Sequence, residues 1–95
     1  MPVGVAINED ELKQVRAKFD VLLKLMEQSL QDEDRILVEK AYDMAVDAHK
    51  YQRRKSGEPY IFHPIEVARI CFEEIGLGPT AVVCALLHDV VEDTP

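Results

Sequence analysis

The chain ends on the stretch Ala85-Leu86-Leu87-His88-Asp89-Val90-Val91-Glu92-Asp93-Thr94-Pro95. Two adjacent polar pairs, His88-Asp89 and Glu92-Asp93, interrupt an otherwise apolar run. Residues four apart in a helix share a face, so both pairs would lie beside one cavity. Buried charges are normally paired or bound to a metal, and imidazole with carboxylate is a common ligand set for a divalent ion. The stretch therefore predicts a metal site on an apolar helix.

Upstream of this stretch, the spacing of apolar residues predicts helices throughout and no strand, so the expected fold class is all-α with about four helices. Asn8 and Glu11 have the spacing of a capping box, which predicts a first helix over about residues 9–30. Its apolar stripe is Leu12, Val15, Phe19, Leu22, Leu23, Met26 and Leu30. A second helix is expected from Asp32 or Asp34 to about Arg53. Its predicted buried stripe is Ile36, Leu37, Ala41, Met44, Ala45 and Ala48.

Glycine and proline mark the remaining boundaries. The stretch Lys55-Ser56-Gly57-Glu58-Pro59-Tyr60 breaks the helical pattern and predicts the one long interior loop. A third helix should begin at His63-Pro64, with Pro64 at the first helical position, and end at Gly76. Gly78-Pro79 should begin the fourth helix. Because residues 81–87 are all apolar, we expect this helix at the centre of the domain.

Charge limits the kinds of partner. The 95 residues carry a net charge of -7, which argues against binding of nucleic acid by its phosphate backbone. Lys50, Arg53, Arg54 and Lys55 nevertheless supply four of the eleven basic residues, so a small anionic ligand is favoured. Cys71 and Cys84 are expected to be reduced core thiols. The sequence shows neither a signal peptide nor a membrane span, and the expected location is the cytoplasm, away from the membrane.

Each candidate residue also has a purely structural interpretation. His63 could cap the helix that follows it, His88 could be a hydrogen-bonded core histidine, and Glu92-Asp93 could be a polar helix end. His49 has no evident partner and is interpreted as structural. For the whole set, the structural interpretation needs several independent coincidences, so we favour a functional site.

The order His63-Pro64 followed by His88-Asp89 in a helical chain resembles the HD superfamily of metal-dependent phosphohydrolases. Two longer blocks sharpen the resemblance: Arg53-Arg54-Lys55-Ser56-Gly57-Glu58-Pro59-Tyr60-Ile61-Phe62-His63-Pro64, and residues 85–94 quoted above. Both look like the amino-terminal hydrolase domain of the Rel/Spo family, the enzymes of the alarmone (p)ppGpp. The resemblance is close over about residues 36–95, whereas the first helix matches only in character.

The resemblance implies roles for individual residues. Three ligands of a Mn²⁺ ion would be His63, His88 and Asp89. The catalytic pair that orients and deprotonates the attacking water would be Glu92 and Asp93. The nucleotide pocket would be formed by Arg54 against the guanine, Lys55 near the phosphates, Ser56 and Tyr60. The implied reaction removes pyrophosphate from the 3′ position and leaves GDP or GTP.

The resemblance also implies a larger parent protein. The family's fourth metal ligand is an aspartate well downstream of the His-Asp pair, so we expect residues 1–95 to be the front part of the domain. Within it, residues 1–31 would form the amino-terminal helix and residues 32–95 the helices that carry the motifs. Intact His-Asp and Glu-Asp pairs point to a hydrolase or a bifunctional synthetase/hydrolase as the parent.

Two other functions remain open: a non-catalytic helical segment for regulation or oligomer contact, and an HD phosphohydrolase of another nucleotide. The Arg54–Tyr60 block argues against the latter. We expect the 95-residue chain alone to be inactive. We also expect it to self-associate through an exposed apolar face of the fourth helix.

Overall fold

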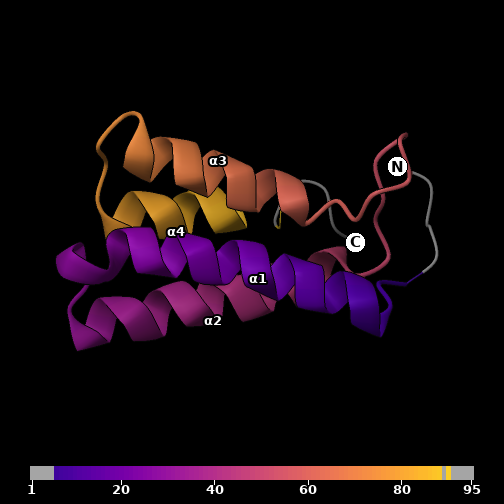
Figure 1. Cartoon of the computed structure of the whole chain (residues 1–95), viewed down its shortest axis with the longest axis horizontal. Helices are drawn as coiled ribbons and strands as arrows, with labels where there is room; N and C mark the ends of the chain where they lie inside the picture. The colour runs from indigo at the N-terminus through magenta and orange to yellow at the C-terminus, as the bar shows by residue number, and fades with distance from the viewer. Residues whose placement is uncertain (1–5, 89, 91–95) are drawn as a thin grey trace.

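The structure, a computed structural model, describes residues 6–88 and 90. It contains helices α1 (Glu9–Met26), α2 (Asp32–His49), α3 (Phe62–Glu73) and α4 (Pro79–Leu87), with a short 3₁₀ helix η1 (Glu27–Ser29) after α1. Successive helices run in opposite directions along one long axis (Figure 1). The described residues form no strand, and Arg53 and Pro59 form an isolated bridge. The all-α prediction is confirmed.

The first helix begins as its capping box predicts. The Asn8 side chain accepts a hydrogen bond from the Glu11 backbone N–H at 2.8 Å, and the Glu11 carboxylate accepts one from the Asn8 N–H at 3.2 Å. Together they satisfy two of the four N–H groups that have no partner inside the helix. The predicted single helix over 9–30 is instead α1 followed by η1. Five stripe residues are buried, whereas Leu12 is exposed and Leu30 is half-buried.

The predicted buried face of the second helix is confirmed only for Ala41 and Ala45, and its predicted end is wrong. Ile36, Leu37 and Met44 are exposed, and the buried face consists of Val38, Ala41, Tyr42, Ala45 and His49. Apolar residues lie around most of α2, so periodicity does not single out one stripe. The Tyr42 ring stacks on Phe19 of α1, with centroids 4.1 Å apart, and this contact selects the buried face. The helix ends at His49 rather than near Arg53, because Gln52 already donates its N–H to the His49 carbonyl in a turn.

Helices α3 and α4 begin and end close to the predicted positions. Pro64 is the third residue of α3 rather than the first, a place where a missing N–H is still harmless. Gly76 has φ +82, and Gly78 is the N-cap of α4. His88 follows α4 as its C-cap, so the predicted continuation of the helix falls mostly outside the described residues. Cys84 is exposed, which contradicts its prediction as a core thiol; Cys71 is half-buried.

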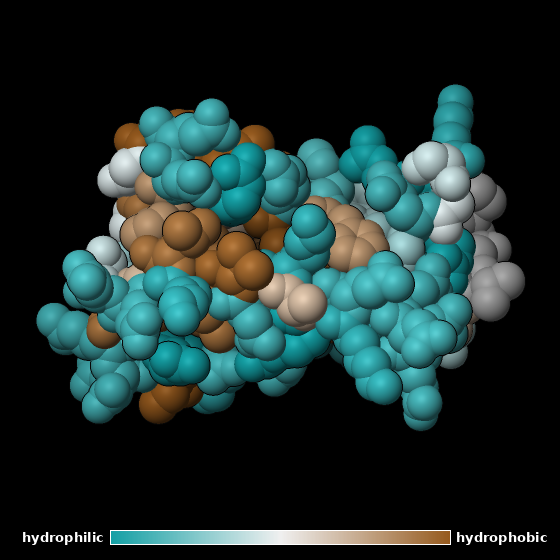
Figure 2. All heavy atoms as spheres, in the orientation of Figure 1, coloured by the Kyte–Doolittle hydropathy of each residue, from teal (hydrophilic) through white to brown (hydrophobic). Residues whose placement is uncertain are grey.

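The four helices share one apolar core. Helix α4 packs against both α2 and α3, and α1 packs against α3. The exposed large hydrophobic side chains of the described residues are Leu12, Val21, Leu25, Ile36, Leu37, Met44, Tyr51, Ile75 and Leu77. None of them is on α4, where the apolar face was expected. Figure 2 shows that, on the face it draws, hydrophobic side chains gather mainly toward the end with the α3–α4 connection.

The opposite end of the bundle is mainly hydrophilic on that face (Figure 2). The start of α1, the end of α2 and the start of α3 lie toward this end, next to the loop of residues 50–61, and α4 runs in its direction but ends nearer the middle of the bundle (Figure 1). We call the twelve residues 50–61 the basic loop. The alternating helix directions thus bring His88, the described part of the carboxy-terminal motif, beside His63 at the start of α3. No helix among the described residues has the length and apolar character that crossing a membrane requires.

Candidate functional site

The basic loop is folded back on itself by its own backbone. The Arg54 N–H donates to the Glu58 carbonyl at 2.9 Å, and the Gly57 N–H donates to the Arg54 carbonyl at 2.8 Å. Gly57 makes the turn with φ +94, in the region that favours glycine. At the base of the loop the Tyr60 N–H donates to the Gln52 carbonyl at 2.9 Å. These bonds hold the basic side chains on a short, ordered turn.

Four side chains of this loop border a single surface hollow. The hollow has a volume of about 500 Å³ and is lined by Arg54, Lys55, Ser56, Tyr60 and His63. The four loop residues in this set are those predicted to bind the nucleotide, and His63 is a predicted metal ligand. A second hollow of about 570 Å³ also includes Arg54 and His63, and extends toward Glu11 and Lys18 of α1. A third hollow, of about 790 Å³, contains none of the predicted site residues.

The cations of the site are held only loosely. Arg54 Nε lies 3.7 Å from Glu58 Oε1, and both side chains are about half exposed. Ser56 Oγ donates to the same Glu58 oxygen at 3.4 Å. Lys55 has no hydrogen bond or ion pair with any residue the structure describes. Exposed ion pairs contribute little stability, so a phosphate group could replace Glu58 as the partner of Arg54 at little cost.

Two predicted metal ligands are next to each other. The rings of His63, in the first turn of α3, and His88, after α4, have centroids 6.1 Å apart. Because an imidazole nitrogen binds a transition-metal ion at about 2.1 Å, two rings on one ion keep their centroids within about 6.5 Å. The His88 Nδ1 lies 2.6 Å from the Ala85 carbonyl, which favours the tautomer with the proton on Nδ1. This leaves the lone pair on Nε2, the arrangement usual for a metal-binding histidine. Both residues therefore fit a divalent ion.

The structure also tests the purely structural interpretations of His63 and His49. His63 is not the N-cap of α3: Ile61 occupies that position, without a side-chain cap. His49 is fully buried, as expected of a structural residue, and its Nδ1 contacts Gln52 Oε1. Its ring lies 5.0 Å from that of Tyr60, which lies 5.7 Å from His63. His49 thus supports a wall of the hollow from beneath, although its Nε2 has no hydrogen-bond partner among the described residues.

The acidic part of the predicted site lies outside the described residues. This applies to the third metal ligand, Asp89, and to the catalytic pair Glu92-Asp93. Within residues 6–88 and Val90, no three His, Cys, Asp or Glu side chains are grouped closely enough to hold a metal. The described part of the site is therefore a basic hollow beside two histidines.

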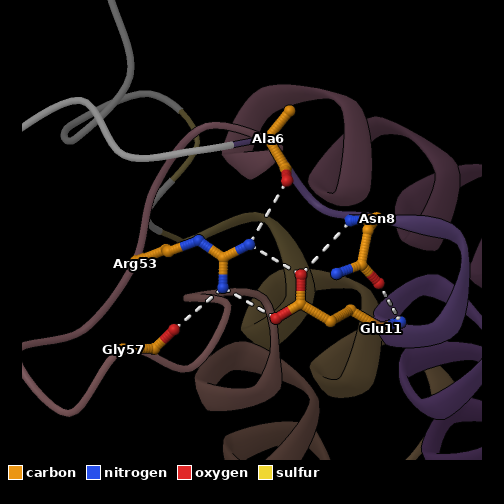
Figure 3. A network of polar contacts seen from close by, with 5 residues as sticks. All are labelled: Ala6, Asn8, Glu11, Arg53 and Gly57. Carbon is orange, nitrogen blue, oxygen red and sulfur yellow. Dashed lines mark hydrogen bonds and ion pairs between the residues drawn. The ribbon is translucent and has the colours of Figure 1, made fainter.

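One contact of the basic loop, the ion pair between Arg53 and Glu11, could not be predicted from the sequence. The Arg53 guanidinium donates to both carboxylate oxygens of Glu11, at 2.6 and 2.7 Å. It also donates to the carbonyls of Gly57 at 2.8 Å and Ala6 at 3.2 Å (Figure 3). Hydrogen bonds from Arg53, and then from the Asn8 N–H, lower the pKa of Glu11 from 4.5 to about 2. The two residues are 42 positions apart, and no periodicity or motif links them.

Known proteins resemble the chain over the same region. A model of the HD domain family matches residues 41–95. The bifunctional (p)ppGpp synthase/hydrolase SpoT of Escherichia coli (strain K12) is 46% identical over 77 residues, which cover 81% of this chain and 11% of SpoT. The bifunctional (p)ppGpp synthase/hydrolase RelA of Mycobacterium tuberculosis is 49% identical over 61 residues, 64% of this chain and 8% of that protein.

A third relative carries the hydrolase name alone. The guanosine-3′,5′-bis(diphosphate) 3′-pyrophosphohydrolase of Aquifex aeolicus is 46% identical over 57 residues, 60% of this chain and 8% of the relative. The chain therefore spans about a tenth of the length of these proteins. The similarity confirms the resemblance to the amino-terminal HD domain of the Rel/Spo family.

Proposed function

The chain belongs to the HD domain family, and from that premise we propose that it forms the front part of a (p)ppGpp 3′-pyrophosphohydrolase site. The substrate would be a guanine nucleotide with a diphosphate on its 3′ oxygen. Hydrolysis would release pyrophosphate and leave GDP or GTP. The names of the three relatives support this substrate, since each acts on (p)ppGpp or on guanosine-3′,5′-bis(diphosphate).

The observation that carries the proposal is the shared hollow. It places Arg54, Lys55 and Ser56 beside His63, whose ring neighbours that of His88. A diphosphate ester is strongly anionic, and the arginine and lysine side chains offer charge-assisted hydrogen bonds to its oxygens. The planar guanidinium of Arg54 can also stack on a base, and Tyr60 adds an aromatic wall. A phosphate bound here would lie next to the two histidines.

The remaining roles follow from the chemistry of the side chains. We assign His63, His88 and Asp89 to hold a divalent ion, and we propose Mn²⁺, which accepts imidazole and carboxylate ligands. Such an ion, when bound, polarises a phosphoryl oxygen and makes water more acidic. We assign Glu92 to orient the attacking water and Asp93 to accept its proton. The water oxygen bonds to the phosphorus next to the 3′ oxygen, and the bond between that phosphorus and the 3′ oxygen breaks. The proton taken up by Asp93 then passes to the 3′ oxygen, which leaves as a hydroxyl group.

The test separates binding from chemistry in the full natural protein. Asp93→Asn removes a proton acceptor, so turnover of (p)ppGpp should collapse while nucleotide and manganese remain bound by calorimetry and elemental analysis. Hydrolysis of other nucleotides at the same rate as (p)ppGpp would favour the broader HD phosphohydrolase function. Full activity of the Asp93 variant would overturn the assigned role.

Self-association is a separate proposal. Exposed Ile36, Leu37 and Met44 on α2, with Val21 and Leu25 on α1, are the apolar side chains that support it. Sedimentation of the 95-residue chain at micromolar concentration tests it. A monomer under those conditions would refute self-association without bearing on the hydrolase proposal.

A further inference from the structure

The Arg53–Glu11 ion pair joins the basic loop to the amino-terminal end of α1. Helix α1 lies outside residues 41–95, the part of the chain that the HD domain model matches. Glu11 nevertheless lines the second hollow together with Arg54 and His63, so it lies at the edge of the proposed site. A contact between these segments can therefore affect how the loop presents its cations.

The geometry of the pair is that of a rigid connection. Both carboxylate oxygens of Glu11 accept from the guanidinium, at 2.6 and 2.7 Å, a planar two-bond arrangement that fixes orientation as well as distance. The side chains of Arg53 and Glu11 are only 18% and 22% exposed, the least exposed of the ion pairs in the described residues. The other pairs, including that between Arg54 and Glu58, are more exposed.

Both partners of the ion pair are themselves fixed. Glu11 is held by the capping box of α1, in which its carboxylate also accepts from the Asn8 N–H (Figure 3). Arg53 directly precedes Arg54, and its guanidinium also donates to the carbonyl of Gly57, the glycine that makes the turn of the loop. The ion pair thus anchors the turn at both ends of the segment Arg54-Lys55-Ser56.

We infer that Glu11 is a positioning residue for substrate binding: through Arg53 it holds the basic loop in the conformation that presents Arg54, Lys55 and Ser56 to the phosphates. The inference rests on the proposed function, because it concerns the substrate of that same site. In this role Glu11 acts through Arg53 and not by a contact of its own with the substrate. Its loss should weaken binding and leave the chemical step unchanged.

The decisive variant is Glu11→Gln. Glutamine is accepted at this position of a capping box, so α1 keeps its start while the two charge-assisted bonds to Arg53 are lost. The matched control is Glu9→Gln, which removes an acidic residue from the same first turn and therefore the same favourable interaction with the helix dipole. If Glu11→Gln lowers the helix content measured by circular dichroism, Arg53→Lys replaces it, since lysine keeps the charge and loses the two-bond geometry.

The first measurement needs no substrate. In the 95-residue chain, hydrogen exchange of the Arg54, Gly57 and Tyr60 amides should become roughly tenfold faster in Glu11→Gln, because local opening of the loop becomes easier. Amides of α3 and α4 should exchange as before, and Glu9→Gln should match the unsubstituted chain. Loop exchange that is the same in Glu11→Gln and Glu9→Gln would overturn the inference, whether or not the protein hydrolyses (p)ppGpp.

The second measurement uses the full natural protein. Glu11→Gln should raise KM for (p)ppGpp roughly three- to tenfold with kcat unchanged, as expected when binding is lost equally from the ground state and the transition state. A fall in kcat with KM unchanged would overturn a positioning role in binding. If the unsubstituted protein does not hydrolyse (p)ppGpp, the proposed function fails, and the exchange experiment alone decides whether Glu11 positions the loop.

Discussion

The basic loop and the histidine pair are neighbours, but they are held in place in different ways. Arg54 and its neighbours lie on a turn that is held by backbone hydrogen bonds within the loop and by the ion pair between Arg53 and Glu11 of α1. His63 and His88 extend from α3 and α4, whose apolar faces are buried in the common core. The two regions therefore differ in what a single substitution can change: the loop depends on one ion pair, whereas packed helices hold the two histidines that we propose as metal ligands.

The largest effect should come from the histidines. His88→Ala in the full natural protein should lower turnover more than about a thousandfold, because the lost ion supplies several kcal/mol of transition-state stabilisation. Elemental analysis should show the metal lost as well. A variant that retains its metal at the original stoichiometry would mean that His88 is not a ligand.

Removing a loop cation should have an intermediate effect on binding. Arg54→Ala should weaken the affinity for (p)ppGpp about ten- to a hundredfold, the amount expected for losing a hydrogen bond to a charged group. Metal content and thermal stability should remain unchanged, because Arg54 has only a loose, exposed ion pair. Arg35→Ala, which removes an exposed arginine of α2 far from the motif residues in sequence, is the charge-matched control for calorimetry. If the two variants bind (p)ppGpp with equal affinity, Arg54 does not contribute to the nucleotide pocket.

Substitution of the two glycines with positive φ should have smaller effects, and comparing them separates a loss of nucleotide binding from a loss of stability. Gly57 and Gly76 have φ +94 and +82, and a Cβ added at either would meet nothing within 4 Å. Substitution by alanine should therefore cost backbone strain alone, about 1–2 kcal/mol of unfolding free energy in each case. Urea denaturation measures this cost. Only Gly57→Ala should also weaken nucleotide binding, and the same loss of affinity in Gly76→Ala would show that general destabilisation is the cause.

The smallest effect is a response to acid. Folding lowers the pKa of Glu11 from 4.5 to about 2, chiefly through hydrogen bonds from Arg53. The group's contribution to stability is therefore complete above about pH 4.5 and is lost as the pH falls toward about 2. The nuclear magnetic resonance signals of the Glu11 carboxylate and the Gly57 amide should share a midpoint near the lower value. A midpoint near 4.5 would mean that the ion pair does not form in solution.

The sequence determined the elements that depend on local chemistry. The capping box predicted the start of α1, Gly76 the end of α3, and Gly78-Pro79 the start of α4, because in each case the deciding backbone angles or hydrogen bonds lie within a few residues. The blocks around Arg54 and His88 were sufficient to indicate the family. The helix ends depend on neighbouring residues, and each family motif is a continuous stretch of the chain, so both can be recognised in the sequence.

Only the tertiary structure decided which face of α2 is buried and what anchors the basic loop. Apolar residues lie around most of α2, and the buried face was selected by the stacking of Tyr42 on Phe19 from another helix. The contact between Arg53 and Glu11 joins residues 42 positions apart. Pairing of single charged side chains leaves no periodic trace in a sequence, because it depends on how the helices pack, and packing is set by the whole core at once.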